Sequence, residues 1–373
     1  MTRVHNFNAG PAALPLAALE RVQSQLLDFH TDDGRGTGMS ILEHSHREPP
    51  YEGVHREAMR LLRELLSVPD THDILFMQGG ARAQFAFVPM NLLHAGKSAD
   101  YVVTGTWAKG ALEEAGVVAK MQGATVRQVV STEKDGRFAR IPTGDELAFD
   151  PGAAYVHITS NNTLFGTQWQ SYPDTGSVPL FADMTSDLCS RKIDVSRFGL
   201  LYAGAQKNVG PAGVTIVIVR KDLVASGRKD IPQIFQYRVM SKNESLFNTP
   251  PTFSIHVMKE TLVELAKKGG IEGLEAEATK KSSMIYERLD ARPDFYRGPV
   301  EKASRSKMNV VFRLPTEDLE KKFLQQAEAR SLVGLKGHRS VGGIRASLYT
   351  AVPTPSVEVL ASFMDTFAAE NGT

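Results

Sequence analysis

Seven short apolar segments between residues 73 and 219 constrain the fold of this chain more than any other feature. Several are apolar at both odd and even positions, which is typical of strands buried on both faces of a sheet. The segments are DILFMQ (73–78), ADYVVTG (99–105), TVRQVV (125–130), AAYVHIT (153–159), VPLFADM (178–184), FGLLYAGAQ (198–206) and GVTIVIV (213–219). Helical patterns, for example at 51–68 and 107–123, lie between them. This alternation predicts an α/β fold with a mostly parallel seven-stranded sheet between helices, in which the last two strands can form an antiparallel hairpin.

The pattern changes after residue 253. A long helical stretch follows, interrupted by Gly269 and Gly270, and two further strands are predicted at 308–314 and 341–349. Helices separate and follow these strands, which indicates a smaller α+β lobe. We therefore expect a large domain over 16–254 and a small C-terminal domain over 255–373 that also includes the N-terminal segment 1–15.

Composition limits the possible partners. The net charge of the 373 residues is +1, which gives no reason to expect nucleic acid or a membrane surface as a partner. No run approaches the roughly 18 apolar residues that a bilayer span requires. The one cysteine, Cys189, cannot form an internal disulfide, and the first residues show no apolar signal segment. We expect a cytoplasmic protein.

Three features gather at predicted strand ends. Lys207 follows one apolar strand, Asp183 ends another, and QGGARAQF (78–85) joins a strand to a helix through Gly79 and Gly80. In open α/β sheets, ligands bind at the carboxyl ends of the strands. The glycine turn leaves backbone N–H groups free for a phosphate at the start of the following helix.

Each feature alone has a simpler explanation. An acid at a strand end is usually a helix cap, a Gly-Gly pair is usually only a turn, and a lysine is usually a surface charge. Taken together, they suggest pyridoxal phosphate. A lysine can bind the aldehyde of this cofactor, a carboxylate can keep its pyridine nitrogen protonated, and the glycine turn can hold its phosphate. Trp107 could supply a flat face over the ring.

Longer motifs resemble those of one family. NFNAGPAALP (6–15), SHR (45–47), DVSRFGLLYAGAQKNVGPAGVTIVIVR (194–220), FNTPPTF (247–253) and LKGHRSVGGIRAS (335–347) are similar to the phosphoserine aminotransferases. These are fold-type I, class-V pyridoxal-phosphate enzymes. The resemblance runs along nearly the whole chain. It implies ping-pong transamination between O-phospho-L-serine and 2-oxoglutarate in serine biosynthesis, with 4-phosphohydroxy-L-threonine, used in vitamin B6 synthesis, as a further possible substrate.

The resemblance also implies roles for residues around the cofactor. Lys207 would bind it covalently and move the proton, Asp183 would pair with the ring nitrogen, and Trp107 would stack on the ring. The other implied cofactor residues are Ala81, Arg82, Thr163 and Gln206, with Asn248 and Thr249 reaching the phosphate from a second subunit. A homodimer with two shared active sites follows.

The substrates are anions at both ends, and the resemblance assigns basic residues to each end. Arg345 would bind the α-carboxylate through its guanidinium fork. The residues His46, Arg47, His338 and Arg339 would bind the distal phosphate or carboxylate, partly across the dimer interface. From the residues alone, HSHR (44–47) could also be a metal site with Glu43 and Glu48, but such spacing is common by chance and we expect no metal.

Two alternatives share the same cofactor chemistry. Alanine–glyoxylate-type aminotransferases need no second cluster of basic residues. Cysteine desulfurases need a mobile nucleophilic cysteine, whereas Cys189 is more typical of a packed thiol. A non-catalytic regulator on this fold would need a DNA-binding segment, for which the chain has neither spare length nor a basic stretch.

Overall fold

The computed structural model describes residues 3–31 and 33–372, so residues 1, 2 and 373 of the predicted small domain lie outside it. Its α-helices are α1 (Leu16–Ser24), α2 (Pro49–Leu65), α3 (Gly80–Leu92), α4 (Thr106–Gln122), α5 (Lys221–Ser226), α6 (Tyr237–Lys242), α7 (Thr252–Ala266), α8 (Gly270–Ala291), α9 (Glu317–Ala329) and α10 (Thr354–Asn371). Its strands are β1 (His5–Asn6), β2 (His72–Met77), β3 (Ser98–Val103), β4 (Thr125–Ser131), β5 (Glu133–Lys134), β6 (Arg137–Phe138), β7 (Val156–Thr159), β8 (Leu180–Asp183), β9 (Phe198–Gly204), β10 (Thr215–Arg220), β11 (Asn309–Phe312), β12 (Leu332–Val333) and β13 (Ile344–Ser347).

The central sheet has seven strands in the order β2-β10-β9-β8-β7-β3-β4. Neighbouring strands from β9 to β4 are parallel, whereas β10 is antiparallel to both β9 and β2. The predicted mostly parallel sheet and the hairpin of its last two strands are therefore confirmed. Because β10 opposes both of its neighbours, β2 runs parallel to β9. The carboxyl ends of β2, β3, β7, β8 and β9 consequently lie at one edge of the sheet.

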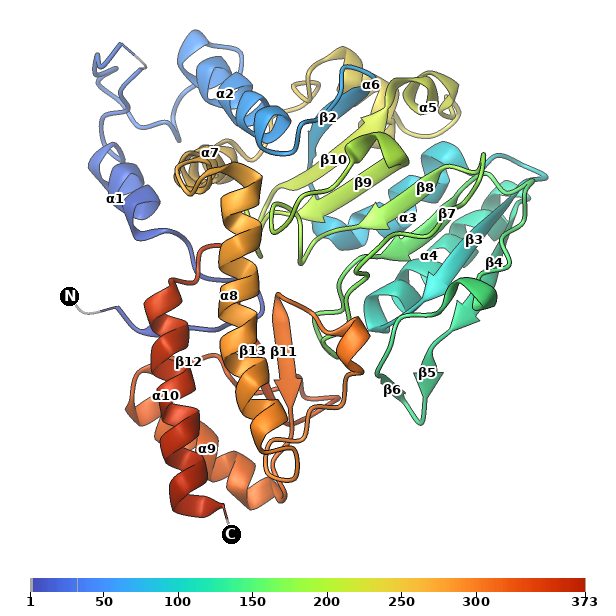
Figure 1. Ribbon diagram of the computed structural model, residues 1–373. Coiled ribbons are helices and arrows are strands. Elements are labelled where there is room, and N and C mark those ends of the chain that lie inside the picture. The colour runs from blue at the N-terminus through green and yellow to red at the C-terminus, as the bar shows by residue number, and fades with distance from the viewer. Residues whose placement is uncertain (1–2, 32, 373) are drawn as a thin grey trace.

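Both faces of this sheet are buried, as the apolar segments predict. In β9, Leu201 and Ala203 belong to a core shared with α2 and α7, whereas Leu200 and Tyr202 belong to a core shared with α3 and α4. Figure 1 shows α3 and α4 behind the sheet, with α2 and α7 packed against each other outside its other face. The sheet is thus the middle layer of three.

The C-terminal part surrounds a third core. Strands β11 and β13 pair antiparallel, and α8 and α10 pack together beside them. The N-terminal segment joins this part, since β1 pairs with β12 and Phe7 lies in the same core. The predicted interruption of the long helical stretch is confirmed. Gly269 directly precedes α8 and Gly270 is its first residue; their φ angles of 84° and 67° are ones that residues with side chains rarely adopt.

Helix α8 connects the two parts. Its first turns contribute Ile271 and Leu274 to the larger core, and its later turns contribute Ala278 and Ile285 to the smaller one. Helix α7 packs on α1 and α2 and so belongs to the part of the molecule that contains the sheet. The division at residues 254 and 255 stays a prediction, and a boundary drawn by packing alone falls inside α8.

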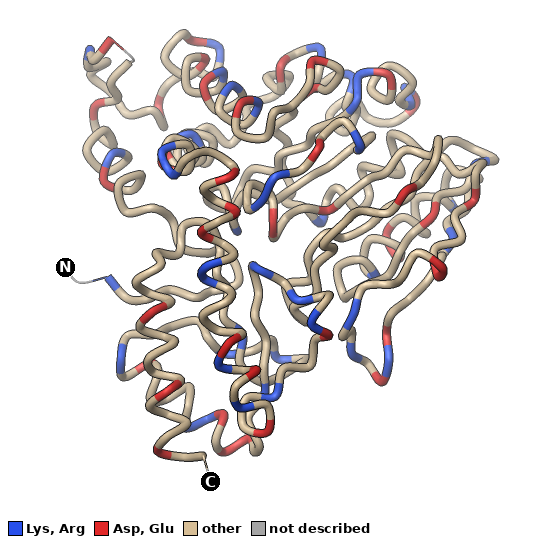
Figure 2. Tube along the Cα trace, viewed as in Figure 1, with Lys and Arg blue, Asp and Glu red and all other residues tan. Residues whose placement is uncertain are grey.

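Acidic and basic residues are mixed along the chain. Figure 2 shows blue and red segments interspersed over the helices of both parts, in keeping with the net charge of +1. Across residues 3–31 and 33–372, no helix is both long enough and apolar enough to cross a membrane.

Candidate active site

The predicted cofactor residues meet at the edge where the parallel strands end. Asp183 is the last residue of β8, Lys207 follows Gly204 at the end of β9, and Trp107 lies in the first turn of α4. A cavity of about 200 Å³ opens at this edge. Its lining includes Ala81, Arg82, Trp107, Thr163, Asp183, Gln206 and Lys207. Parallel register thus gathers residues that are up to 126 positions apart, from 81 to 207.

Lys207 extends into this cavity from the turn after β9. Its Nζ donates a hydrogen bond of 2.6 Å to Thr163 Oγ1 and lies 5.9 Å from the centre of the Trp107 indole. Desolvation lowers the pKa of Lys207 to about 8; the charge of Asp183 opposes this shift and the charge of Arg345 adds to it. About a tenth of such amines are neutral at pH 7, against less than about a thousandth for an ordinary lysine. Lys207 is therefore prepared to act as a nucleophile.

Asp183 is a buried carboxylate without a full countercharge. Its side chain is 5% exposed, and Oδ1 accepts a hydrogen bond of 2.9 Å from the Thr185 N–H. Among the described residues no ion pair forms with it, and burial raises its pKa, partly offset by Thr185 and Lys207. A second buried acid, Asp187, is instead paired with Arg191 at 3.8 Å. Asp183 is thus the carboxylate left available for a cationic ligand atom.

Helix α3 begins at the rim of the same cavity. Gly79 and Gly80 have φ angles of 93° and 67°, and a Cβ on Gly79 would lie 2.6 Å from the Cβ of Ala83. Only glycine therefore suits this entry to the helix. The free N–H groups of the first turn and the helix dipole favour an anion, and Arg82 adds a positive charge. The Arg82 guanidinium lies 5.5 Å from the centre of the Trp107 ring.

Arg345 reaches the site from the C-terminal part. It lies on β13, and its Nη1 is 3.5 Å from the carbonyl oxygen of Thr163. Its Nε is buried without a hydrogen-bond partner among the described residues. Burial lowers the pKa of Arg345. A buried donor without an acceptor is costly, so this guanidinium is suited to receive a carboxylate.

Two further predicted residues lie on the loop before β13. His338 and Arg339 line neither this cavity nor a neighbouring one of about 500 Å³ that Arg345 borders. Burial, then the charges of Arg345 and Arg339, lower the pKa of His338. The loop is therefore near enough to Arg345 for their charges to interact.

The remaining predicted residues do not line the Lys207 cavity of their own chain. Asn248 borders a cavity of about 320 Å³ on the far side of Gly79, and the Thr249 carbonyl accepts a hydrogen bond of 2.8 Å from Gln78. His46 is buried, and its Nε2 has no hydrogen-bond partner in the part of the chain that the structure describes; Arg47 is exposed. None of the four lines the Lys207 cavity.

Sequence reasoning missed several polar residues of the cavity wall. They are Thr159, Asn161, Thr185 and Ser186. Each lies at or just after the end of β7 or β8. The signal was present, because polar residues that follow a buried strand in a parallel sheet share one edge. Their hydroxyl and amide groups are equally common in ordinary turns, however.

The residues present fit pyridoxal phosphate. The cavity offers a nucleophilic amine at Lys207, a carboxylate without a countercharge at Asp183, an anion-binding helix start at Gly80 and an indole face at Trp107. The buried Nε1 of Trp107 and Oγ1 of Thr104 have no partner among the described residues. Polar atoms of this kind are expected where a ligand completes the hydrogen bonding. No group of three or more metal-binding side chains occurs within the described part of the chain.

The remaining alternative chemistry concerns Cys189. Its thiol is 1% exposed, and burial raises its pKa. The prediction of a packed thiol is confirmed, and a mobile nucleophile of the desulfurase type is not found at this position.

Comparison with known proteins gives consistent results. The family model for class-V aminotransferases matches residues 4–360. A phosphoserine aminotransferase of Niallia circulans is 50% identical over 370 residues, which cover 99% of this chain and 99% of the relative.

Two solved structures extend this likeness to three dimensions. The phosphoserine aminotransferase from Bacillus circulans subsp. alkalophilus has a TM-score of 0.93 at 50% identity, with 99% of each chain covered. The phosphoserine aminotransferase from Trichomonas vaginalis, solved with pyridoxal phosphate bound, has a TM-score of 0.91 at 37% identity, covering 97% of this chain and all of that one. With a family match over most of its length and relatives that share half of its residues, this chain belongs to the class-V aminotransferases and, among them, to the phosphoserine aminotransferases.

Proposed function

We propose that this protein is a pyridoxal-phosphate-dependent transaminase that moves an amino group between O-phospho-L-serine and 2-oxoglutarate, giving 3-phosphohydroxypyruvate and L-glutamate in serine biosynthesis. The observation that carries this proposal is the Lys207 amine, whose pKa falls to about 8 in a cavity that also holds Asp183. The relatives at about 50% identity support the choice of phosphoserine as a substrate.

Lys207 performs two tasks in this proposal. When bound, pyridoxal phosphate supplies a carbonyl carbon that accepts an amine and a protonated ring that draws electrons from the carbon next to that amine. Lys207 Nζ holds the cofactor between turnovers. With the substrate amine in its place, the free Lys207 amine would act as the base that takes the proton from the substrate Cα and holds it for return. The hydrogen bond to Thr163 keeps the amine on this side of the cavity.

The other cavity residues would hold and orient the cofactor. Asp183 stabilises the proton on the ring nitrogen, because a buried carboxylate favours a cationic neighbour. Trp107 packs against the ring, and the N–H groups at the start of α3, with Arg82 and Gln206, bind the phosphate.

Two substrates must be accepted in turn, and both carry negative charge at each end. Arg345 binds the α-carboxylate common to phosphoserine and glutamate. His338 and Arg339 bind the distal group, which is a phosphate of charge about −1.5 to −2 in one substrate and a carboxylate in the other. His46 and Arg47 of a second subunit complete this distal cluster.

We also propose a homodimer with shared active sites. His46, Arg47, Asn248 and Thr249 do not line the Lys207 cavity of their own chain, which supports their entering the site of another chain. Large apolar side chains are exposed in the N-terminal third; Leu27 is 86% exposed. Further apolar residues in this region with substantial exposure are Leu16, Leu26 and Leu42.

Mixing two inactive variants tests the sharing of sites. Lys207→Ala and Arg47→Ala each damage both sites of a homodimer, but a mixed dimer contains one intact site. Turnover should return when the two purified variants are refolded together. A mixture as inactive as its components, at a concentration where sedimentation shows dimers, would count against sharing.

The reaction itself is tested by trapping and by a coupled assay. Borohydride treatment of protein saturated with pyridoxal phosphate should add the cofactor to the peptide that contains Lys207, as seen by mass spectrometry, and Lys207→Ala should abolish both adduct and turnover. The assay compares phosphoserine, 4-phosphohydroxy-L-threonine and alanine as amino donors to 2-oxoglutarate. Turnover with alanine alone would contradict the substrate proposal while leaving the cofactor chemistry intact. For its location we propose the cytoplasm, which cell fractionation tests.

A further inference from the structure

The loop that carries His338 and Arg339 is built around the side chain of another arginine. The loop closes through a bridge between Lys336 and Ile344, and the Gly337 N–H donates to the Gly343 carbonyl at 2.8 Å. Within it, the N–H groups of Val341 and Gly342 both donate to the His338 carbonyl, at 2.9 and 2.8 Å. These hydrogen bonds fix the shape of the loop. Its orientation relative to the site must be fixed by contacts with residues outside the loop.

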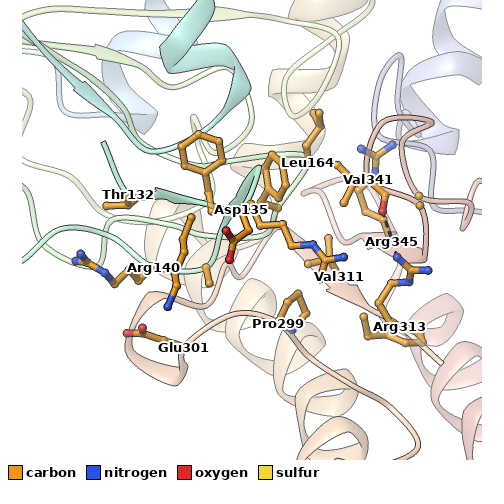
Figure 3. A pocket seen from close by; sticks show the side chains of 18 of the residues that line it. Thr132, Asp135, Arg140, Leu164, Pro299, Glu301, Val311, Arg313, Val341 and Arg345 are labelled. Carbon is orange, nitrogen blue, oxygen red and sulfur yellow. Dashed lines mark hydrogen bonds between the residues drawn. The ribbon is translucent and has the colours of Figure 1, made fainter. Parts of the chain in front are cut away.

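Arg313, which directly follows β11, makes that external contact. Its Nη1 donates a hydrogen bond of 3.3 Å to the Val341 carbonyl, drawn as a dashed line in Figure 3. Figure 3 also shows Arg313 and Arg345 on the same side of the neighbouring cavity. The guanidinium of Arg313 is thus bound to the loop backbone at one end.

Two glycines lie directly against this side chain. A Cβ on Gly342 would have the Arg313 guanidinium as its nearest neighbour, at 3.5 Å, and a Cβ on Gly343 would lie 2.5 Å from Arg313 Cδ. Their φ angles are 72° and 73°. The positive φ favours glycine at both positions, and at Gly343 the absence of a side chain also permits the loop backbone to rest on Arg313.

Glu320 on α9 fixes the other side of Arg313. Its Oε1 accepts from Arg313 Nε at 2.5 Å and from the Leu314 N–H at 3.2 Å, and its side chain is 9% exposed. A buried carboxylate with two donors holds a guanidinium more firmly than an exposed ion pair does. The contact therefore runs from α9 through Glu320 and Arg313 to the Val341 carbonyl.

We propose that Arg313 is a positioning residue, which with Glu320 holds the 336–344 loop so that His338 and Arg339 face the distal anion of the substrate. This inference rests on the proposed function, because it assigns those two residues to the phosphate. Arg345 is held separately, since β13 pairs with β11 at Val311 and the Arg345 N–H donates to the Leu335 carbonyl at 2.8 Å. Loss of Arg313 should therefore disturb the distal contact and spare the α-carboxylate contact.

The test is a double-variant cycle on the enzyme loaded with its cofactor. Arg313→Met should raise KM for phosphoserine about tenfold, the usual effect of one hydrogen bond to a charged group, and change kcat less than about twofold. In an Arg339→Ala background the same substitution should have a smaller effect, because His338 is then the only one of the two residues left for it to position. Arg297→Met removes a nearby exposed arginine as a matched control and should leave KM unchanged.

The outcomes separate the two proposals. Full additivity of Arg313→Met and Arg339→Ala would overturn the positioning role, since it would mean that Arg313 acts on the substrate independently. An equal loss of kcat with glutamate and with phosphoserine, accompanied by a changed absorbance spectrum of the bound cofactor, would also overturn it. An unmodified protein that does not turn over phosphoserine would instead refute the proposed function, before any variant is compared.

Discussion

Replacing Arg345 by lysine should separate the geometry of this residue from its charge. The β13 backbone is held in register by β11, so the substitution should leave the strand intact. A guanidinium can bind both oxygens of a carboxylate, whereas an ammonium makes one strong contact, so one charge-assisted bond is lost. Such a bond contributes about 1.5–3 kcal/mol, which corresponds to a decrease of about ten- to a hundredfold in kcat/KM. Both phosphoserine and glutamate should be affected, because both carry the α-carboxylate.

The charge of Arg345 has a second, independent consequence at Lys207. It lowers the pKa of Lys207, so Arg345→Met should raise that pKa above about 8. A higher pKa leaves less neutral amine at pH 7, so unloaded protein should bind the cofactor covalently more slowly at neutral pH and regain speed as the pH rises. Arg345→Lys keeps the charge and should keep the pH profile of the unmodified protein.

Two measurements decide between these effects. Steady-state kinetics with each amino donor give kcat/KM, and the rate of absorbance change on mixing unloaded protein with pyridoxal phosphate, from pH 6 to 10, gives the pKa of Lys207. Unchanged kcat and KM in Arg345→Lys would refute the role of the guanidinium fork. Identical pH profiles in Arg345→Met and Arg345→Lys would refute the electrostatic contribution to Lys207.

Three further substitutions should each have an effect whose direction follows from the structure. Arg339→Ala should raise KM for phosphoserine more than for glutamate, because the phosphate carries more charge than a carboxylate; equal increases in the two KM values would contradict this. Asp183→Asn should lower the pKa of Lys207 below about 8, since the Asp183 charge opposes the desolvation there, and should reduce turnover. The pH dependence of the rate at which unloaded protein binds pyridoxal phosphate measures the change in this pKa, and a pKa that does not move would show that the two groups are not coupled. Gly79→Ala forces a Cβ to within 2.6 Å of Ala83 at a φ of 93°, so it should destabilise the fold by about 1–3 kcal/mol and weaken cofactor binding. Gly80→Ala, whose Cβ would meet open space, is the milder comparison, and equal melting temperatures for both variants would argue against the clash.

The sheet and the reactive end of the site could be predicted because their signals are local. Strands buried on both faces leave continuous apolar segments, as in β9, where Leu200 and Leu201 pack into opposite cores. Asp183 and Lys207 follow such segments directly, and parallel strands bring their carboxyl ends to one edge. Spacing along the chain and one topological rule were therefore enough to place these two side chains together.

Other parts of the site depend on contacts that leave no local pattern. Arg313 follows a strand in the same way as Asp183 does, yet its role comes from the path of a loop 28 residues further on, where Val341 meets it. Gly342 and Gly343 could have been turn residues of any kind; both have positive φ, and only at Gly343 would a Cβ come as close as 2.5 Å to the Arg313 side chain. Thr185 does follow a buried strand, which signals the shared edge, but a threonine there as commonly serves a turn, so the residue alone does not point to the cavity wall.

The larger part, which contains the sheet, and the smaller C-terminal part meet one residue away from the reactive amine. Asn208, next to Lys207, accepts a hydrogen bond of 3.1 Å from the Thr350 N–H at its Oδ1, and its own carbonyl accepts one of 2.6 Å from Thr350 Oγ1. Its Nδ2 donates to the Ser186 carbonyl at 2.9 Å, beside the end of β8. Thr350 follows the strand that carries Arg345. The hydrogen bonds between Asn208 and Thr350 therefore connect the turn that carries Lys207 to that strand. The distance between the Lys207 amine, which takes the Cα proton, and the Arg345 guanidinium, which holds the α-carboxylate, is therefore set by contacts between the larger and the smaller part. Neither part alone determines it.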